Sequence, residues 1–352
     1  MDAFILSASK DRAGLANCID GLRHHCQPKP QRIFIVYQGT DKPELPAYVD
    51  VQILLHQENV AYPALKKEEL TCQLANRWHA LGLTKAAAAK QANRACGWYY
   101  QQLLKLMLFR AFPESDDNVL VMDSDATFIN PVRIIAEDGT VLEPQGYPFQ
   151  FSEGELPAAA FDSIPHSHIR FAKRLLPDWH LQHGYSGMVH HMLFQRPIMA
   201  EIIAKAERMH SCDFPCAVIQ AIDSCNWNAM SEYVLYHHYA LMHYPRQRSL
   251  QICTVVDLLY DSNAQPPVSL SQPSVTTTEW MKKYVTINWR EVEQIGMHGF
   301  NDLAARLQSM DYLPAEEKLR LSKTVREHGC FFISLQNSVR FWGVTGVMNP
   351  VM

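Results

Sequence analysis

One segment, VLVMDSDATF at residues 119–128, constrains the fold of this chain more than any other. Four consecutive apolar residues are typical of a strand that is buried on both faces, as in the parallel sheet of an α/β protein. The strand leads directly into Asp123 and Asp125. Because α/β proteins bind ligands at the carboxyl edge of the sheet, the segment predicts a binding site at these two acids.

The first 60 residues supply further strands for the same sheet. Apolar and β-branched runs at 3–7, 32–37 and 51–55 are typical of strands, and apolar residues at helical spacing lie between the first two. Pro28 and Pro30 end that helix. The pattern predicts an α/β fold with a mostly parallel sheet flanked by helices.

Weaker patterns describe the rest of the chain. They predict a hairpin at 133–143 around Asp138 and Gly139, a strand at 186–194, and helices at 197–210 and 231–242. A polar, proline-containing stretch at 261–279 is typical of a linker. We therefore expect a main region at 1–260 and a C-terminal extension of mixed structure at 261–352.

Composition excludes several classes of protein. The 352 residues are 47% hydrophobic and 19% charged, as in packed globular proteins, and the net charge of −4 provides no basic surface for nucleic acid. No apolar run reaches the roughly 20 residues of a transmembrane helix, although peripheral membrane contact stays open. The start of the chain lacks the pattern of a signal peptide. Nine cysteines, an odd number, favour reduced thiols and a cytoplasmic protein.

Several residues suggest chemistry. Asp123 and Asp125 are two positions apart, so on a strand they share a side, and their carboxylates suit Mg²⁺ or Mn²⁺. The alternative interpretation is that they are solvated loop acids or turn-forming residues without a ligand. A second group of potential metal ligands consists of His210, Cys212, Cys216 and Cys225. Their spacing matches no standard zinc motif.

The helix at 98–109 is apolar on most sides, which indicates burial. Its polar exceptions Gln101, Gln102 and Lys105 share one face. A buried ammonium needs an anionic partner. That partner is either a protein carboxylate or the diphosphate of a nucleotide, and the sequence leaves both open.

Five motifs occur together in one order. They are SASKD at 7–11, WYYQQLLKL at 98–106, VMDSDATF at 121–128, SGMVHHMLF at 186–194 and SEYVLY at 231–236. This set resembles metal-dependent glycosyltransferases of the GT-A fold, and more narrowly a glycosyltransferase-like family of bacterial and viral surface-polysaccharide gene sets. The resemblance covers residues 3–245. It implies a GT-A-like catalytic domain at 1–260, with a donor half at about 1–130 and an acceptor half at about 131–260.

The resemblance also implies roles for individual residues. Asp123 and Asp125 would hold Mn²⁺ or Mg²⁺ against the diphosphate of a nucleotide-sugar donor. Nine residues would contact the donor, three of which are the polar helix positions described above. They are Ser7, Ala8, Ser9, Asp11, Tyr37, Gln101, Gln102, Lys105 and Ser124. A third metal ligand would be His243 or His298, and the sequence does not select between them.

The acceptor side is implied in the same way. Ser186, Gly187, His190 and His191 would line the sugar pocket. Consecutive strand residues point to opposite sides, so at most one of the two histidines faces the pocket directly, and one buried and one surface histidine is the alternative. Glu232 would be the general base of an inverting reaction. It is otherwise an acid favoured at the start of a helix that Ser231 caps.

The expected function is transfer of a sugar from a nucleotide-sugar donor to a hydroxyl of a glycan or glycolipid. DSDAT also matches the opening of haloacid-dehalogenase-type phosphatases, with Asp123 as nucleophile and Asp125 as acid or base. No second acidic motif of that class follows. A catalytically degenerate carbohydrate-binding module is the non-enzymatic alternative, and the intact Asp-x-Asp pair argues against it.

Overall fold

The computed structural model describes residues 1–8, 12–128, 131–144 and 166–251, and the backbone of strands at 255–260, 285–287 and 332–337. The chain divides into two compact units that alternate along the sequence. The first unit comprises 1–9, 30–122 and 134–251, and the second comprises 10–29, 123–133 and 252–352. The domain boundaries expected near 130 and at 260 stay predictions.

The first unit contains a five-stranded sheet in the order β4-β3-β1-β5-β9. Its strands are β1 (Asp2–Ser7), β3 (Arg32–Tyr37), β4 (Gln52–Gln57), β5 (Asn118–Asp123) and β9 (His191–Gln195). The β1–β3 and β3–β4 pairs are parallel, and β9 is antiparallel to β5. All of β1 is buried, as expected for a strand covered on both faces. The predicted α/β class is confirmed.

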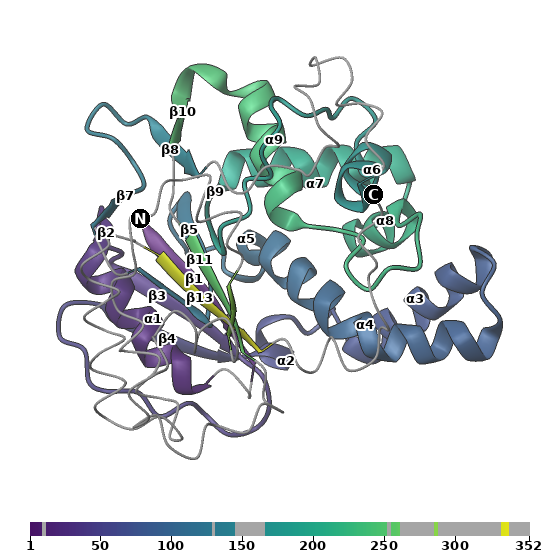
Figure 1. Ribbon diagram of the computed structural model, residues 1–352, viewed down its shortest axis with the longest axis horizontal. Helices are drawn as coiled ribbons and strands as arrows, with labels where there is room; N and C mark the ends of the chain where they lie inside the picture. Colours follow the sequence, from purple (N-terminus) through teal and green to yellow (C-terminus); the bar gives the residue numbers. More distant parts are fainter. Residues whose placement is uncertain are drawn as a thin grey trace, which may run out of the picture. The chain divides into compact units, whose positions relative to one another are not determined.

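The first unit also contains several helices. They are α2 (Glu58–Ala61), α3 (Lys67–Ala80), α4 (Lys85–Leu106), α5 (Leu108–Ala111), α6 (Ser167–Leu175), α7 (Arg196–His210), α8 (Phe214–Ala221), α9 (Glu232–His243) and the 3₁₀ helix η3 (Pro245–Gln247). Helices α3 and α4 pack against each other as a hairpin (Figure 1). The predicted helices at 197–210 and 231–242 are confirmed as α7 and α9. The side chain of Ser231 caps α9 by accepting from the backbone N–H of Val234.

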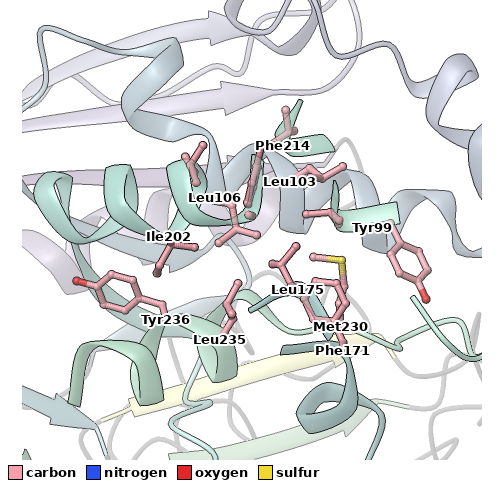
Figure 2. Packing of buried hydrophobic residues seen from close by; sticks show 14 of the residues in the cluster. Tyr99, Leu103, Leu106, Phe171, Leu175, Ile202, Phe214, Met230, Leu235 and Tyr236 are labelled. Atoms are coloured by element: carbon pink, nitrogen blue, oxygen red, sulfur yellow. The ribbon is translucent and has the colours of Figure 1, made fainter. Parts of the chain in front are cut away.

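Helices α6, α7, α8 and α9 share one apolar core with α4 (Figure 2). Its side chains include Tyr99, Leu103, Leu106, Phe171, Leu175, Ile202, Phe214, Met230, Leu235 and Tyr236. Hydrogen bonds add to this packing, because Trp98 Nε1 donates to the carbonyl of Met230 and Tyr99 Oη donates to that of Asn226. The start of α9 is thereby fixed against α4.

One of two further sequence predictions is confirmed. The hairpin around Asp138 and Gly139 is present, with Gly139 at φ 86° and an antiparallel bridge between Ile135 and Val141. Strand β8 (Val141–Pro144) also pairs in parallel with β10 (Arg248–Gln251). The strand expected at 186–194 begins only at His191. Gly187 and His190 have φ values of 72° and 61°, and such left-handed backbone cannot continue an extended strand.

The second unit contains α1 (Arg12–His25) and short strands. These are β2 (Cys26–Gln27), β6 (Ala126–Phe128), β7 (Val132–Arg133), β11 (Val255–Tyr260), β12 (Val285–Ile287) and β13 (Phe332–Asn337). Strands β12, β11, β13 and β6 form one sheet, and β2 pairs with β7. Within the described residues of the chain, the helices are too short or too polar to cross a bilayer.

Candidate functional site

The acidic segment lies where the sequence places it, at the end of a buried strand. Asp123 is the last residue of β5, while Ser124 and Asp125 form the turn that leads into β6. Ser124 is buried, and the two acids on either side of it are half-buried. Asp123 and Asp125 are thus buried to a similar degree. Asp125 belongs to a turn, however, and not to a strand as the sequence predicted.

Helix α1 holds the backbone of this segment. The Cys18 thiol donates to the carbonyl oxygen of Asp123 over 3.6 Å, and the Thr127 hydroxyl donates to the carbonyl of Asn17 over 2.8 Å. Gly21 permits the close approach, because a Cβ there would lie 2.4 Å from Thr127 Oγ1 and 2.7 Å from the backbone nitrogen of Phe128. Sequence reasoning missed these contacts, since nothing in the local pattern of α1 indicates what packs on Gly21.

Two groups of potential metal ligands occur among the described residues. One includes Asp123 and Asp125, and the other consists of His183, His237 and His238. Of the two ligands that the sequence left open, His243 is exposed and belongs to neither group, and His298 lies outside the described residues.

The two consecutive histidines differ in environment. His191 is buried at the start of β9, with Nδ1 3.1 Å from the carbonyl oxygen of Val189. His190 is half-buried in the left-handed backbone conformation, which non-glycine residues adopt uncommonly and often at functional sites. The expectation that at most one of these two histidines faces the sugar pocket directly stays a prediction.

Ser186 and Gly187 are both buried. Ser186 Oγ accepts from the backbone N–H of Met188 over 3.1 Å. A Cβ on Gly187 would lie 2.5 Å from Cγ of His237, so the segment passes close to α9. Gly187 is therefore required both by its positive φ and by the histidine ring beside it.

Two of the expected donor-contacting residues are neighbours in the sheet. Ser7 and Tyr37 are paired at the ends of the parallel strands β1 and β3. Ser7 is buried, while Ala8 and Tyr37 are half-buried. Ser9 and Asp11 lie outside the described residues. The carboxyl edge of these strands is where α/β proteins bind ligands.

The polar residues of α4 contact the start of α9. Lys105 Nζ lies 2.7 Å from Oε1 of Glu232 and 3.3 Å from the Tyr233 hydroxyl. Gln102 Oε1 accepts from the backbone N–H of Glu232 over 3.1 Å. Gln102, Lys105 and Glu232 are buried, whereas Gln101 is half-buried. Of the two partners left open for Lys105, a protein carboxylate is therefore present.

The second histidine group is buried within the first unit. His237 and His238 on α9 are inaccessible to solvent, and His183 is half-buried in the loop before Ser186. Burial lowers the pKa of His237 to about 3, and burial together with the neighbouring His237 lowers that of His183 to about 3. These two rings are therefore neutral at pH 7.

No family model and no curated protein matches the sequence. A solved structure with some similarity is the crystal structure of mouse xyloside xylosyltransferase 1 in its apo form. The two chains are 9% identical, and the match covers 84% of this chain and 93% of the mouse protein with a TM-score of 0.34. A likeness of this size assigns neither a family nor an activity.

Proposed function

We propose that this chain is a metal-dependent glycosyltransferase, which transfers a sugar from a nucleotide-sugar donor to a hydroxyl of a glycan or glycolipid. The observation that carries the proposal is the pair Asp123 and Asp125 at the end of the buried strand β5. Neither acid is fully buried, and helix α1 fixes the backbone that presents them. A rigid edge with two accessible carboxylates is suited to a cation and a phosphate-bearing ligand.

The cation would be held by the carboxylates of Asp123 and Asp125, which lie on either side of the buried Ser124. Carboxylate oxygens favour Mn²⁺ or Mg²⁺, and such a cation, when bound, neutralises charge on a leaving diphosphate.

The remaining residues would bind and orient the two substrates. Ser7 and Tyr37, paired at the ends of β1 and β3, would contact the nucleotide, together with Ala8. The segment that contains Ser186 and Gly187 would lie along the sugar, since its backbone is held tightly against α9. Aligning donor and acceptor in this way accounts for a large part of the rate in two-substrate reactions.

The identity of the general base is a separate part of the proposal. An inverting transfer needs a carboxylate that accepts the acceptor proton, and Glu232 was the candidate from the sequence. Its carboxylate is bound by Lys105 and is only 2% exposed. These contacts favour a structural role for Glu232, and the anomeric outcome stays a prediction.

A thermal-shift screen tests the ligand assignment. The full-length protein is melted with each of a panel of nucleotide sugars, with and without Mn²⁺. A bound ligand raises the apparent stability by about 2.7 kcal/mol at 100 times its Kd. We expect a shift that requires both nucleotide sugar and Mn²⁺, and that is lost in Asp123→Asn and retained in the control Glu68→Gln, which changes an exposed acid on α3. The same shift with free phosphate alone would point to a phosphatase instead.

A further inference from the structure

The three histidines of the second group converge on one point. His237 and His238 come from α9, and His183 comes from the loop before Ser186. One ring nitrogen of each lies within 4.8 Å of the others. The Nε2 atoms of His183 and His237 are 3.1 Å apart. All three residues belong to the first unit, so their arrangement is internal to it.

The spacing of the two Nε2 atoms matches a metal centre. Zinc binds histidine nitrogen at about 2.0 to 2.1 Å in tetrahedral geometry, which places two ligand nitrogens about 3.3 Å apart. The observed 3.1 Å is close to that value. His238 completes a set of three protein ligands, and in zinc sites with three protein ligands the fourth position is taken by water or an added molecule.

The outer nitrogen of one ring has the hydrogen-bond partner that metal-bound histidines usually have, and a carboxylate lies near the outer nitrogen of another. Nδ1 of His237 lies 3.5 Å from Oε2 of Glu143, a carboxylate that is also paired with Arg248. Nε2 of His238 lies 3.0 Å from the carbonyl oxygen of Tyr185. Ligating histidines typically donate their second N–H to a carboxylate or carbonyl, which fixes the ring and its tautomer.

We propose that His183, His237 and His238 bind a divalent transition-metal ion of the zinc type, at a site chemically distinct from the acidic pair. Imidazole nitrogens favour Zn²⁺, Co²⁺ or Ni²⁺, whereas the carboxylates of Asp123 and Asp125 favour Mn²⁺ or Mg²⁺. The proposal does not depend on the proposed transferase activity.

Binding requires a local rearrangement. In the structure the backbone N–H groups of Tyr185 and Gln182 donate to Nδ1 of His183 and of His238, each over 3.1 Å. Those bonds leave the proton of His183 on Nε2, where it is shared with His237. A metal ion would take the place of that proton, and His183 would carry its proton on Nδ1. The N–H groups of Tyr185 and Gln182 would then turn away from Nδ1 of His183 and of His238. Of the three histidines, His183 is the one that is exposed to solvent in part.

The test uses the full chain carrying Asp123→Asn and Asp125→Asn, so that the acidic pair holds no cation. After dialysis against Zn²⁺ or Co²⁺, the metal content is measured by mass spectrometry, and the visible spectrum of the Co²⁺ form reports the geometry. We expect one equivalent of metal and the strong absorption of tetrahedral Co²⁺. Adding His183→Gln should weaken the affinity for Zn²⁺ by at least about tenfold, as loss of a ligand costs no less than loss of its supporting partner.

A matched control is available in the same loop. His180 is exposed, and His180→Gln should leave the metal content unchanged. The melting curves of both glutamine variants without metal establish that they are folded. Metal content below one tenth of an equivalent in the Asp123→Asn, Asp125→Asn protein, or equal losses in His183→Gln and His180→Gln, would overturn the site.

Discussion

Lys105 Nζ lies 2.7 Å from Oε1 of Glu232, and each of the two side chains is 2% exposed. The ion pair joins α4 to the first turn of α9. The ammonium also lies 4.6 Å above the ring of Tyr233, which adds a cation–π contact. Two residues that the sequence assigned to separate roles, contact with the donor and general-base catalysis, are thus partners of each other.

Breaking this pair should destabilise the protein. Glu232→Gln leaves the ammonium of Lys105 buried without its counter-charge, and we expect a loss of about 3 to 5 kcal/mol in the free energy of unfolding. Urea denaturation measures it. The double variant Lys105→Met, Glu232→Leu removes both charges and should recover most of the loss. If the free energy of unfolding of Glu232→Gln instead equals that of the wild type, the ion pair does not stabilise the fold.

The same variant separates catalysis from structure. A lost general base lowers turnover by about 10² to 10⁴. A lost ion pair leaves turnover per folded molecule within about threefold, well below that range. The burial of Glu232 favours the second result. A drop of 10² or more in fully folded Glu232→Gln protein, with inversion of the anomeric centre seen by NMR, would instead establish Glu232 as the base.

Two glycines provide a matched test of how α1 positions the acidic segment. Gly21→Ala would place a Cβ 2.7 Å from the backbone nitrogen of Phe128, and we expect a loss of about 1 to 3 kcal/mol. Gly97 lies in α4 and has nothing within 4 Å of an added Cβ, so Gly97→Ala should gain about 0.5 to 1 kcal/mol. Urea denaturation of both proteins checks the signs. Two changes of the same sign would contradict the packing of α1 on β6.

Acidification should destabilise the protein through His168. Burial, with a smaller effect of His166, lowers the pKa of His168 from 6.5 to about 3, while Nε2 lies 2.8 Å from the carbonyl oxygen of Asn228. The folded state therefore binds fewer protons than the unfolded state between pH 6.5 and pH 3. The stability from this group is complete above pH 6.5 and is lost as the pH falls, by about 1.4 kcal/mol per pH unit.

The variant His168→Gln isolates this effect. Its amide can still donate to Asn228 but does not titrate, so the slope of stability against pH should fall by about the same 1.4 kcal/mol per unit. Denaturation curves collected across this pH range give the slope. An unchanged slope would mean that His168 is not the group responsible.

The sequence predicted those features of the fold that depend on residues close together along the chain. An apolar run before two acids predicted the end of β5, and Ser231 before an acid predicted the capped start of α9. The Lys105–Glu232 pair spans 127 positions, and no local pattern indicates such a contact. The strand expected at 186–194 is present only from His191 onward, and its first part was wrong for a related reason. The residue types favour extended backbone there, but packing against His237 places Gly187 in a left-handed conformation.

The candidate site could be predicted in part for the same reason. Asp123 and Asp125 are two positions apart at the end of an apolar run, so their place at a sheet edge could be predicted. The convergence of His183 on the histidines of α9 depends on the path of a loop. This is a long-range property that spacing along the chain does not reveal.

The most direct test is sugar transfer with and without metal. Release of the nucleoside diphosphate from the donor found in the thermal-shift screen is measured in Mn²⁺ and in excess chelator, for wild type, Asp123→Asn, Asp125→Asn and Glu68→Gln. A bound cation supplies several kcal/mol of charge stabilisation, so chelator and both asparagine variants should each lower turnover by at least about 100-fold, with Glu68→Gln unchanged. Full turnover of the wild type in chelator and of both asparagine variants would contradict the account.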